Sequence, residues 1–255
     1  MLSSYLFIFL LGTLFGSFVN VLIDRVPRNQ NIFISRSHCD HCKKTLSWYE
    51  LIPIFSYLFL QGKCSKCKKD ISPRNVIVEV ITGLMFVALT MSLYLSTSLY
   101  VIITMLLVLC ILLAIFYIDL DHGIIPDQLL IVLLLLAFFL HIEQPMHNIV
   151  SYLFIGICSL LFFLFIYVIT REKGMGFGDV KFSFIIGFLL GFPDTIIALY
   201  VAFLTGAIIS LILVLLGKKR LHNDVIPFGP FLVTGIIVAI FLGGKIINEI
   251  PFLHL

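Results

Sequence analysis

Residues 99–127 read LYVIITMLLVLCILLAIFYIDLDHGIIPD, and this stretch decides the fold. Its first part, Leu99 to Ile118, carries no charged side chain and is apolar almost throughout. About 20 such residues are needed for a helix to cross a bilayer. Three aspartates follow, where a spanning helix would meet water. The stretch therefore predicts a transmembrane helix with a carboxylate-rich end.

Similar apolar runs lie on both sides of this stretch. Of the 255 residues, 60% are hydrophobic and 12% are charged, and the mean hydropathy is +1.13, which excludes an ordinary soluble globular protein. The other long runs are Tyr5 to Ile23, Val76 to Leu95, Ile149 to Thr170, Thr195 to Leu216 and Phe228 to Gly244, and two shorter runs are Gln128 to Ile142 and Phe182 to Phe192. We therefore expect an all-α polytopic membrane protein with about eight transmembrane helices. The first helix is expected to be retained, because no basic region precedes it and no small-residue cleavage site follows it.

The basic residues lie on one side of these predicted helices. With eight crossings, 16 of the 17 Lys and Arg fall on one side and only Lys245 falls on the other. By the positive-inside rule the lysine-rich side is the cytoplasm. Phe182 to Phe192 is short enough to be a re-entrant segment instead, but residues 218–220 (KKR) would then lie outside. The charge rule thus favours two crossings and places Leu255 outside.

One hydrophilic insert, residues 24–75, interrupts the helices and holds ten of the basic residues. We predict three parts: a first transmembrane helix at 1–23, this cytoplasmic insert, and a transmembrane domain at 76–255. An insert of this size is too small to form a sizeable core alone, so it is expected to need a metal, disulfides or docking onto a larger body.

Four cysteines in the insert form a candidate metal site. Cys39-x-x-Cys42 and Cys64-x-x-Cys67 are separated by 21 residues, which is close to the spacing of two turns that bind one tetrahedral zinc. Four thiolates leave no open position for a substrate water, so the predicted zinc is structural.

Other interpretations of the cysteines remain open. Two disulfides are disfavoured in the reducing cytoplasm, while a redox pair or an unmetallated state is the alternative to zinc. His38 and His41 are alternative ligands, although exposed histidines beside the metal are the simpler interpretation. Cys110 and Cys158 lie in apolar runs and are expected to be buried.

The aspartates suggest a second kind of site. Asp119, Asp121 and Asp127 follow one predicted span, and Asp179 lies in Gly174-Met-Gly-Phe-Gly-Asp-Val-Lys181, where the chain re-enters the membrane on the same side. Two close carboxylates share a proton, so that one activates water while the other polarises a peptide carbonyl. Glycines before Asp179 allow backbone or substrate to approach closely. Taken singly, each aspartate is also explained as a helix cap or a solvated residue, and for Asp127 an N-cap is the favoured interpretation.

Taken together, the motifs resemble the type IV prepilin leader peptidases, many of which are also N-methyltransferases. The resemblance covers nearly the whole chain. It includes residues 16–21 (GSFVNV), the four-cysteine insert, residues 72–79 (SPRNVIVE), residues 226–231 (IPFGPF) and, most specifically, Gly176-x-Gly178-Asp179-x-Lys181.

The resemblance implies that residues 76–255 are an aspartic peptidase domain in which Asp119 and Asp179 are catalytic, supported by Gly176, Gly178, Lys181 and Glu79. It also implies cleavage of the short basic leader of prepilins or pseudopilins at the cytoplasmic membrane face of a bacterial cell. A methyl transfer from S-adenosylmethionine follows from the resemblance only, and its site is not located by the sequence. The expected partners are these precursors and the lipid bilayer, with no nucleic acid.

Acidic residues of the insert are candidates for receiving a basic leader, although ion pairs with nearby lysines explain them equally well: Asp24, Glu50 and Asp70. Glu79 differs, because it lies inside an apolar run, where a carboxylate is costly without a partner or a task.

Two other functions fit the composition. A cation-coupled transporter would place carboxylates nearer the middle of the membrane, whereas Asp119 and Asp179 lie at the ends of apolar runs. A metal-dependent membrane phosphotransferase would need further carboxylates and an arginine near its site. Both are less consistent with the motifs than a peptidase.

Overall fold

The structure is a computed structural model that describes residues 2–32, 36–39, 41–93, 97–171, 174–217 and 226–249. The described chain is almost entirely helical and contains no β-strand, only two isolated bridges, His38 with Thr45 and Lys63 with Asp70. It divides into two compact units, Met1–Ala114 and Ile115–Leu255, and the division falls within α4 (Leu99–His122).

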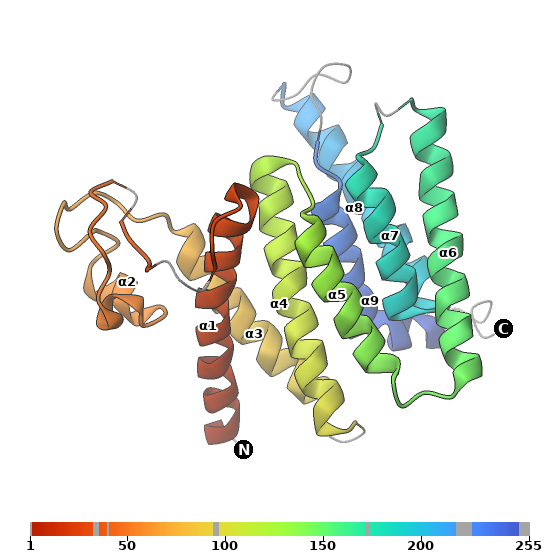
Figure 1. Cartoon of the computed structure of the whole chain (residues 1–255), viewed down its shortest axis with the longest axis horizontal. Helices are drawn as coiled ribbons and strands as arrows, with labels where there is room; N and C mark the ends of the chain where they lie inside the picture. The colour runs from red at the N-terminus through yellow and green to blue at the C-terminus, as the bar shows by residue number, and fades with distance from the viewer. Residues whose placement is uncertain are drawn as a thin grey trace. The chain divides into compact units, whose positions relative to one another are not determined.

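The first unit contains a pair of long helices, α1 (Leu2–Arg25) and α3 (Arg74–Leu93), drawn side by side in Figure 1. Glycines allow their backbones to come close: a Cβ atom on Gly12 would lie 2.8 Å from Cα of Gly83, and one on Gly16 would lie 2.7 Å from Cα of Glu79. Small residues at the contact are typical of helices that pack within membranes. The insert between them has three short helices, η1 (Val26–Arg28), η2 (Trp48–Leu51) and α2 (Phe55–Phe59).

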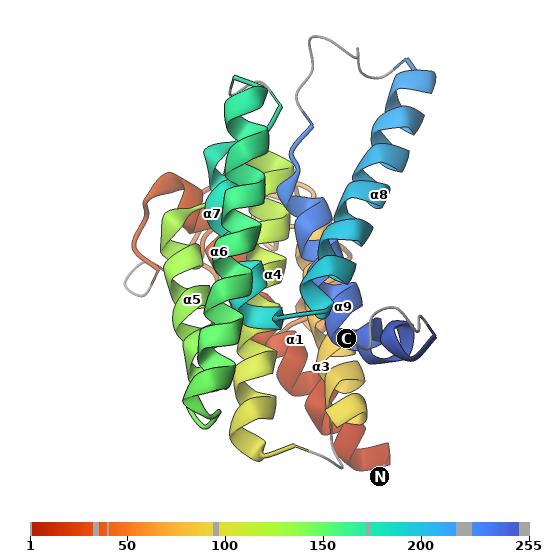
Figure 2. The same ribbon diagram turned by 90° about the vertical axis from the view of Figure 1, so that its right-hand side faces the viewer.

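The second unit is built around α7 (Phe177–Leu190), which contacts the other four helices of that unit: α5 (Asp127–His141), α6 (Met146–Ile169), α8 (Asp194–Leu215) and α9 (Gly229–Glu249). Figure 2 shows α8 alongside α9, and α6 beside α7. A Cβ atom on Gly187 would lie 2.7 Å from Cα of Gly156, so α6 and α7 also meet through glycines. Most of α7 is buried, which fixes the position of its first turn.

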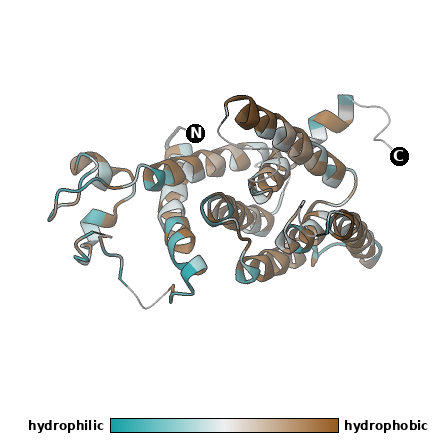
Figure 3. Cartoon of the chain, turned by 90° about the horizontal axis from the view of Figure 1, so that it is seen from above, coloured by the Kyte–Doolittle hydropathy of each residue, from teal (hydrophilic) through white to brown (hydrophobic). Residues whose placement is uncertain are grey.

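Six helices of the described chain are long and apolar enough to cross a membrane: α1, α3, α4, α6, α8 and α9. Figure 3 colours these helices mostly as hydrophobic. The two shorter predicted runs are helices as well, α5 with 15 residues and α7 with 14. The predicted all-α polytopic fold is therefore confirmed, while the number of full crossings stays at the approximate value of eight. Residues 218–220 and Leu255, on which part of the topology prediction rests, lie outside the described residues.

One burial prediction is half wrong. Cys110 is buried in α4, as expected, but Cys158 is exposed on α6. The reason is that α6 presents a broad apolar face outward, and an apolar run by itself does not distinguish a core-facing residue from a lipid-facing one.

Candidate active site

Two aspartates far apart in the sequence come together in the second unit. Asp119 lies near the end of α4 and is 4% exposed, and Asp179 lies in the first turn of α7 and is 6% exposed. The two carboxyl groups are close enough to interact electrostatically. The pairing that the sequence made possible is thus present in the fold.

Each carboxyl group has one oxygen without a partner. Oδ2 of Asp119 and Oδ1 of Asp179 are buried, and neither has a hydrogen-bond partner within the described chain. The other oxygen of Asp179, Oδ2, accepts a hydrogen bond of 3.1 Å from the backbone N–H of Gly176, which fixes the side chain at the start of α7. Buried polar atoms are rarely left unpaired in proteins, so these two oxygens are suited to a shared proton, a water or a substrate group.

Glycines surround the pair. A Cβ atom on Gly229 would lie 2.5 Å from Oδ2 of Asp119, and one on Gly178 would lie 3.2 Å from Cβ of Ile125. Gly229 begins α9, so the candidate site combines the end of α4 with the starts of α7 and α9. Residue 229 belongs to the IPFGPF motif of residues 226–231, to which the sequence alone assigned no role. Its contact with Asp119 depends on the packing of α9, which no local pattern reveals.

The remaining residues of the two aspartate boxes lie differently. Asp121 and Asp127 are exposed, whereas Asp119 is buried. Lys181 forms an ion pair with Asp127, with 2.8 Å between Nζ and Oδ1, and both side chains are largely exposed. The N-cap prediction for Asp127 is wrong: α5 begins at Asp127 itself after Pro126, without a side-chain cap, because the carboxylate turns to Lys181 instead.

The four predicted zinc ligands also come together, in the first unit. The sulfur atoms of Cys39, Cys42, Cys64 and Cys67 lie within 4.8 Å of one another, and all four thiols are free. Two of the Sγ–Sγ distances are 3.8 and 3.9 Å. A tetrahedron with Zn–S bonds of about 2.3 Å has edges of about 3.8 Å, so the cluster fits a zinc ion.

The two cysteine turns have the same backbone pattern. The N–H of Cys39 donates to the carbonyl of Lys44, and that of Cys64 donates to the carbonyl of Lys69, both at 2.9 Å. Backbone N–H groups of Cys67 and Lys66 lower the pKa of Cys64, while burial and the neighbouring thiols raise the pKa of Cys67, so the first thiolate of the cluster forms at Cys64. His38 and His41 are exposed beside the cluster, as the simpler interpretation expected.

Buried Glu50 joins the two turns. It accepts hydrogen bonds from the backbone N–H of Ser47 at 2.8 Å and from Ser65 Oγ, and its Oε1 lies 2.9 Å from Lys44 Nζ. These groups, the Ser47 N–H first, lower its pKa to about 2. Asp24 is paired with Arg74. The carboxylates of Glu50 and Asp24 thus bind groups of the protein itself.

Glu79 is 8% exposed in α3 and accepts a hydrogen bond of 2.8 Å from the backbone N–H of Ile54. A carboxylate in an apolar run requires a hydrogen-bond partner, and the insert supplies that partner for Glu79. A catalytic support role for Glu79 stays a prediction.

Comparison with known proteins gives the family. The model of the Bacterial Peptidase A24 N-terminal domain matches residues 10–93, and that of the Type IV leader peptidase family matches residues 106–211. A protein of Legionella pneumophila named Prepilin leader peptidase/N-methyltransferase is 34% identical over 272 residues, covering 96% of this chain and 93% of that protein. The chain belongs to the type IV leader peptidase family. The predicted resemblance and the predicted enzyme class, a peptidase, are both confirmed.

Further relatives carry the same name. One from Bacillus subtilis is 32% identical, covering 96% of both chains, and one from Pseudomonas aeruginosa is 31% identical, covering 93% of this chain and 90% of that protein. No solved structure matches the chain. Both aspartates of the candidate site fall within residues 106–211, and the four cysteines fall within residues 10–93.

Proposed function

We propose that this protein is a membrane-embedded aspartic endopeptidase that removes the short basic leader from prepilins or pseudopilins, with Asp119 and Asp179 as its catalytic pair. The observation that carries the proposal is that both carboxyl groups are buried and that each has one oxygen without a hydrogen-bond partner in the described chain. The relatives named prepilin leader peptidases support the choice of substrate.

The proposed chemistry uses one proton shared by two carboxyl groups. The ionised group takes a proton from a water molecule, and the resulting hydroxide attacks the carbonyl carbon of the scissile peptide bond. The protonated group donates a hydrogen bond to the carbonyl oxygen and so stabilises the developing negative charge. The proton taken from water then passes to the leaving nitrogen. Oδ2 of Asp119 and Oδ1 of Asp179 are the atoms available for these steps.

We place this reaction at the cytoplasmic membrane face. The one-sided distribution of Lys and Arg supports this side, and the position of both aspartates at helix ends supports a site near the membrane surface. A precursor with a basic leader and an apolar helix would present its junction at that depth. Labelling of single cysteines in intact cells tests the topology, and a probe in the insert that reacts only from outside would contradict it.

The supporting residues have separate roles in this proposal. Gly176 holds Asp179 through its N–H, and Gly178 permits the contact with Ile125. Lys181 extends from the same turn of α7 as Asp179 and joins α7 to α5 through Asp127. It therefore positions the first turn of α7 rather than acting on the substrate.

The four-cysteine cluster is proposed to bind one structural zinc. Cys39, Cys42, Cys64 and Cys67 supply all four positions of a tetrahedral ion, so no substrate or water has access to the metal. Its task is to fold the insert, which has few other means of stabilisation.

Methyl transfer to the new N-terminus is proposed from the resemblance and from the names of the relatives. S-adenosylmethionine supplies the methyl group and combines a positive sulfonium, an ammonium group and a carboxylate. A cavity of about 420 Å³ in the first unit is lined by acidic Asp70 and by the ion pair of Asp24 with Arg74, so charged groups of both signs border it. We assign the cofactor to this cavity. Equilibrium dialysis with labelled S-adenosylmethionine tests it: Asp70→Asn should weaken binding about tenfold, and unchanged binding would argue against the cavity.

The experiment that tests the peptidase proposal uses purified protein in lipid vesicles and a prepilin segment with its leader. Mass spectrometry of the products should show one cut between the basic leader and the apolar helix. A preparation with both Asp119→Asn and Asp179→Asn serves as the control, because it keeps the fold and loses proton exchange. Equal cleavage by the two preparations would remove the aspartic mechanism.

A further inference from the structure

The insert carries an apolar surface that a water-exposed domain would not be expected to present. In η2, α2 and the turn between them, Trp48 is 78% exposed and Phe59 is 87% exposed. Together with five more exposed side chains they form what we call the apolar face: Trp48, Tyr49, Leu51, Ile52, Phe55, Leu58 and Phe59. Figure 3 shows this hydrophobic colour within an insert that is otherwise largely hydrophilic. Contiguous exposed apolar residues of this kind mark a contact with another body or with a membrane.

The apolar face is held beside a transmembrane helix. The backbone N–H of Ile54, in the middle of the face, donates to Oε2 of Glu79 at 2.8 Å. Glu79 lies five residues beyond Arg74, the first residue of α3, or about 7.5 Å along the helix axis at 1.5 Å per residue. Figure 1 accordingly draws α2 at the level of α1 and α3 rather than beyond their ends. The hydrogen bond therefore keeps Ile54 within the depth of a spanning helix.

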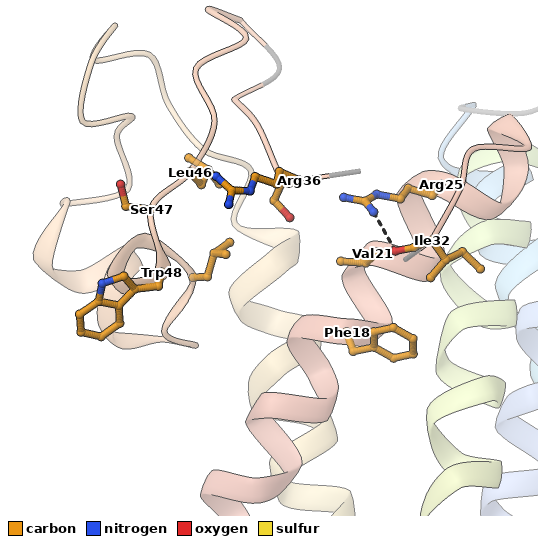
Figure 4. A pocket seen from close by; sticks show the side chains of 10 residues that line it. Phe18, Val21, Arg25, Ile32, Arg36, Leu46, Ser47 and Trp48 are labelled. Carbon is orange, nitrogen blue, oxygen red and sulfur yellow. Dashed lines mark hydrogen bonds between the residues drawn. The ribbon is translucent and has the colours of Figure 1, made fainter. Parts of the chain in front are cut away.

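A cavity joins the apolar face to the outer surface of α1. It has a volume of about 600 Å³ and is lined by Phe18 and Val21 of α1 and by Trp48 and Leu51 of the insert. Figure 4 shows Trp48 and Phe18 on opposite sides of this cavity, both toward its lower end. Phe18 is 43% exposed on α1, which is long and apolar enough to cross a membrane, so the apolar face continues onto an exposed apolar surface of that helix.

The other end of the cavity is basic. Arg25 and Arg36 line it, and Figure 4 shows both guanidinium groups away from Phe18. Nη1 of Arg25 donates to the carbonyl of Ile32 at 2.9 Å, which holds the group at the end of α1. The cavity is thus apolar at one end and basic at the other. This order matches a phospholipid, whose acyl chains suit the apolar end and whose phosphate suits the basic end.

Backbone N–H groups in the apolar face are hydrogen-bonded, as a medium with little water requires. Besides the bond from Ile54 to Glu79, the N–H of Phe55 donates to the carbonyl of Pro53 at 2.6 Å, and the N–H of Ser56 donates to that of Ile52 at 3.0 Å. Ile54 itself has φ 63° and ψ −53°, a tight turn that is strained for a β-branched residue. The Glu79 carboxylate offsets that strain and pairs an N–H that would be costly to leave unpaired in lipid.

We propose that residues 48–59 lie in the interfacial layer of the bilayer, with the apolar face against acyl chains and with Glu79 as the residue that positions the segment there. The partner is the phospholipid membrane, and the cavity beside α1 receives lipid, with its phosphate toward Arg25 and Arg36. This surface belongs to the first unit, whereas the aspartates of the peptidase site belong to the second. In this proposal the carboxylate of Glu79 has a structural task, which explains why it is present within a spanning helix although burial there is costly.

Trp48 is the only tryptophan of the chain, so the tryptophan emission of the intact protein reports on the apolar face alone. The protein is placed in vesicles whose lipids carry bromine on the acyl chains, and Trp48 emission is compared with that in unbrominated vesicles. We expect most of the emission to be lost to brominated lipid and little to be lost to iodide in the water. Quenching by iodide without quenching by bromine would overturn the proposal. Protection from both quenchers would also overturn it, because the face would then contact protein, whether another part of this chain, a second copy or a substrate helix.

Variants of Glu79 test the positioning role by the same measurement. Glu79→Gln keeps a side-chain oxygen that accepts from the Ile54 N–H, so quenching by bromine should persist. Glu79→Leu has similar bulk and no acceptor, so Trp48 should become accessible to iodide. Because fluorescence requires no catalysis, the result is independent of peptidase activity, and the variant with both Asp119→Asn and Asp179→Asn should give the wild-type quenching pattern. Identical quenching of the Gln and Leu variants would remove Glu79 from the proposal.

Discussion

Gly229 leaves the space that the carboxyl group of Asp119 occupies: a Cβ atom at position 229 would lie 2.5 Å from Oδ2 and 3.0 Å from Cγ of Asp119. Carbon and oxygen atoms do not approach so closely without a bond, so any side chain here must displace either the carboxyl group or the start of α9. The geometry of the candidate site thus depends on a residue with no side chain of its own.

Gly229→Ala should therefore lower prepilin cleavage by about 100-fold or more, because a displacement of about 1 Å in a catalytic group has effects of that size. Cleavage is measured by separating precursor and mature pilin on a gel, at equal amounts of membrane-inserted enzyme. The matched control is Gly244→Ala in the same helix, where a Cβ atom would meet nothing within 4 Å. It should retain near-normal activity. Full activity of Gly229→Ala would mean that Asp119 does not act from its observed position.

Replacing a zinc ligand should lower the stability of the insert more than it changes the peptidase reaction of the molecules that remain folded. Purified protein is expected to contain about one zinc per chain, and Cys64→Ser should lose that metal and make the insert sensitive to limited proteolysis. Metal content is measured by mass spectrometry and proteolysis by the appearance of cuts within residues 24–75.

Cys158→Ser is the control for the zinc experiment, because Cys158 is exposed on α6 and belongs to the other unit. It should keep its zinc and an intact insert. A metal-free preparation of the unaltered protein that is folded and active would refute the structural role of the metal.

The insert should lose stability in acid, because the charged form of Glu50 stabilises it. The pKa of Glu50 is lowered from an ordinary value of 4.5 to about 2, chiefly by the N–H of Ser47 and the hydroxyl of Ser65. A group with a lowered pKa in the folded state stabilises the fold above its unfolded pKa and loses that contribution as the pH falls from about 4.5 toward about 2. Near neutral pH the stabilisation should be full.

Glu50→Gln measures this contribution. The substitution should lower the free energy of unfolding by about 1–3 kcal/mol near neutral pH, because the hydrogen-bond partners of the buried charge are left poorly paired. The difference in the free energy of unfolding between variant and wild type should shrink as the pH falls through the stated range. A difference that is constant with pH would show that Glu50 does not act through its charge.

The sequence predicted the helices well because the bilayer imposes a simple requirement. Every spanning segment must be a run of apolar residues that satisfies its own backbone, and such runs are visible without knowledge of packing. The four cysteines were equally visible, because two short turns place their sulfur atoms near one point whatever surrounds them. Asp119 and Asp179 were selected through motifs, and the structure buries both of them in the second unit.

What the sequence did not reveal are contacts between distant segments. Asp127 forms an ion pair with Lys181 and does not cap a helix as expected. The carboxylate of Glu79 accepts a hydrogen bond from the backbone N–H of Ile54. The closeness of Gly229 to Asp119 is of the same kind. Each depends on how two helices, or a helix and a loop, are placed in space, and a local pattern of residue types contains no such information.

The final prediction concerns the two aspartates together. Asp119→Asn and Asp179→Asn should each abolish nearly all cleavage, because Asn keeps the size of the side chain but cannot exchange a proton. The double variant should be hardly worse than either single one, since residues that act as one unit are not additive. Asp121→Asn and Asp127→Asn should retain much more activity, because both side chains are exposed, whereas Asp119 is 4% exposed. All variants are compared at equal membrane levels by the ratio of leader-bearing to mature pilin. Loss of cleavage at Asp121 alone would mean that the catalytic residue of the first box is Asp121, and substantial cleavage by either of the first two variants would exclude the proposed pair.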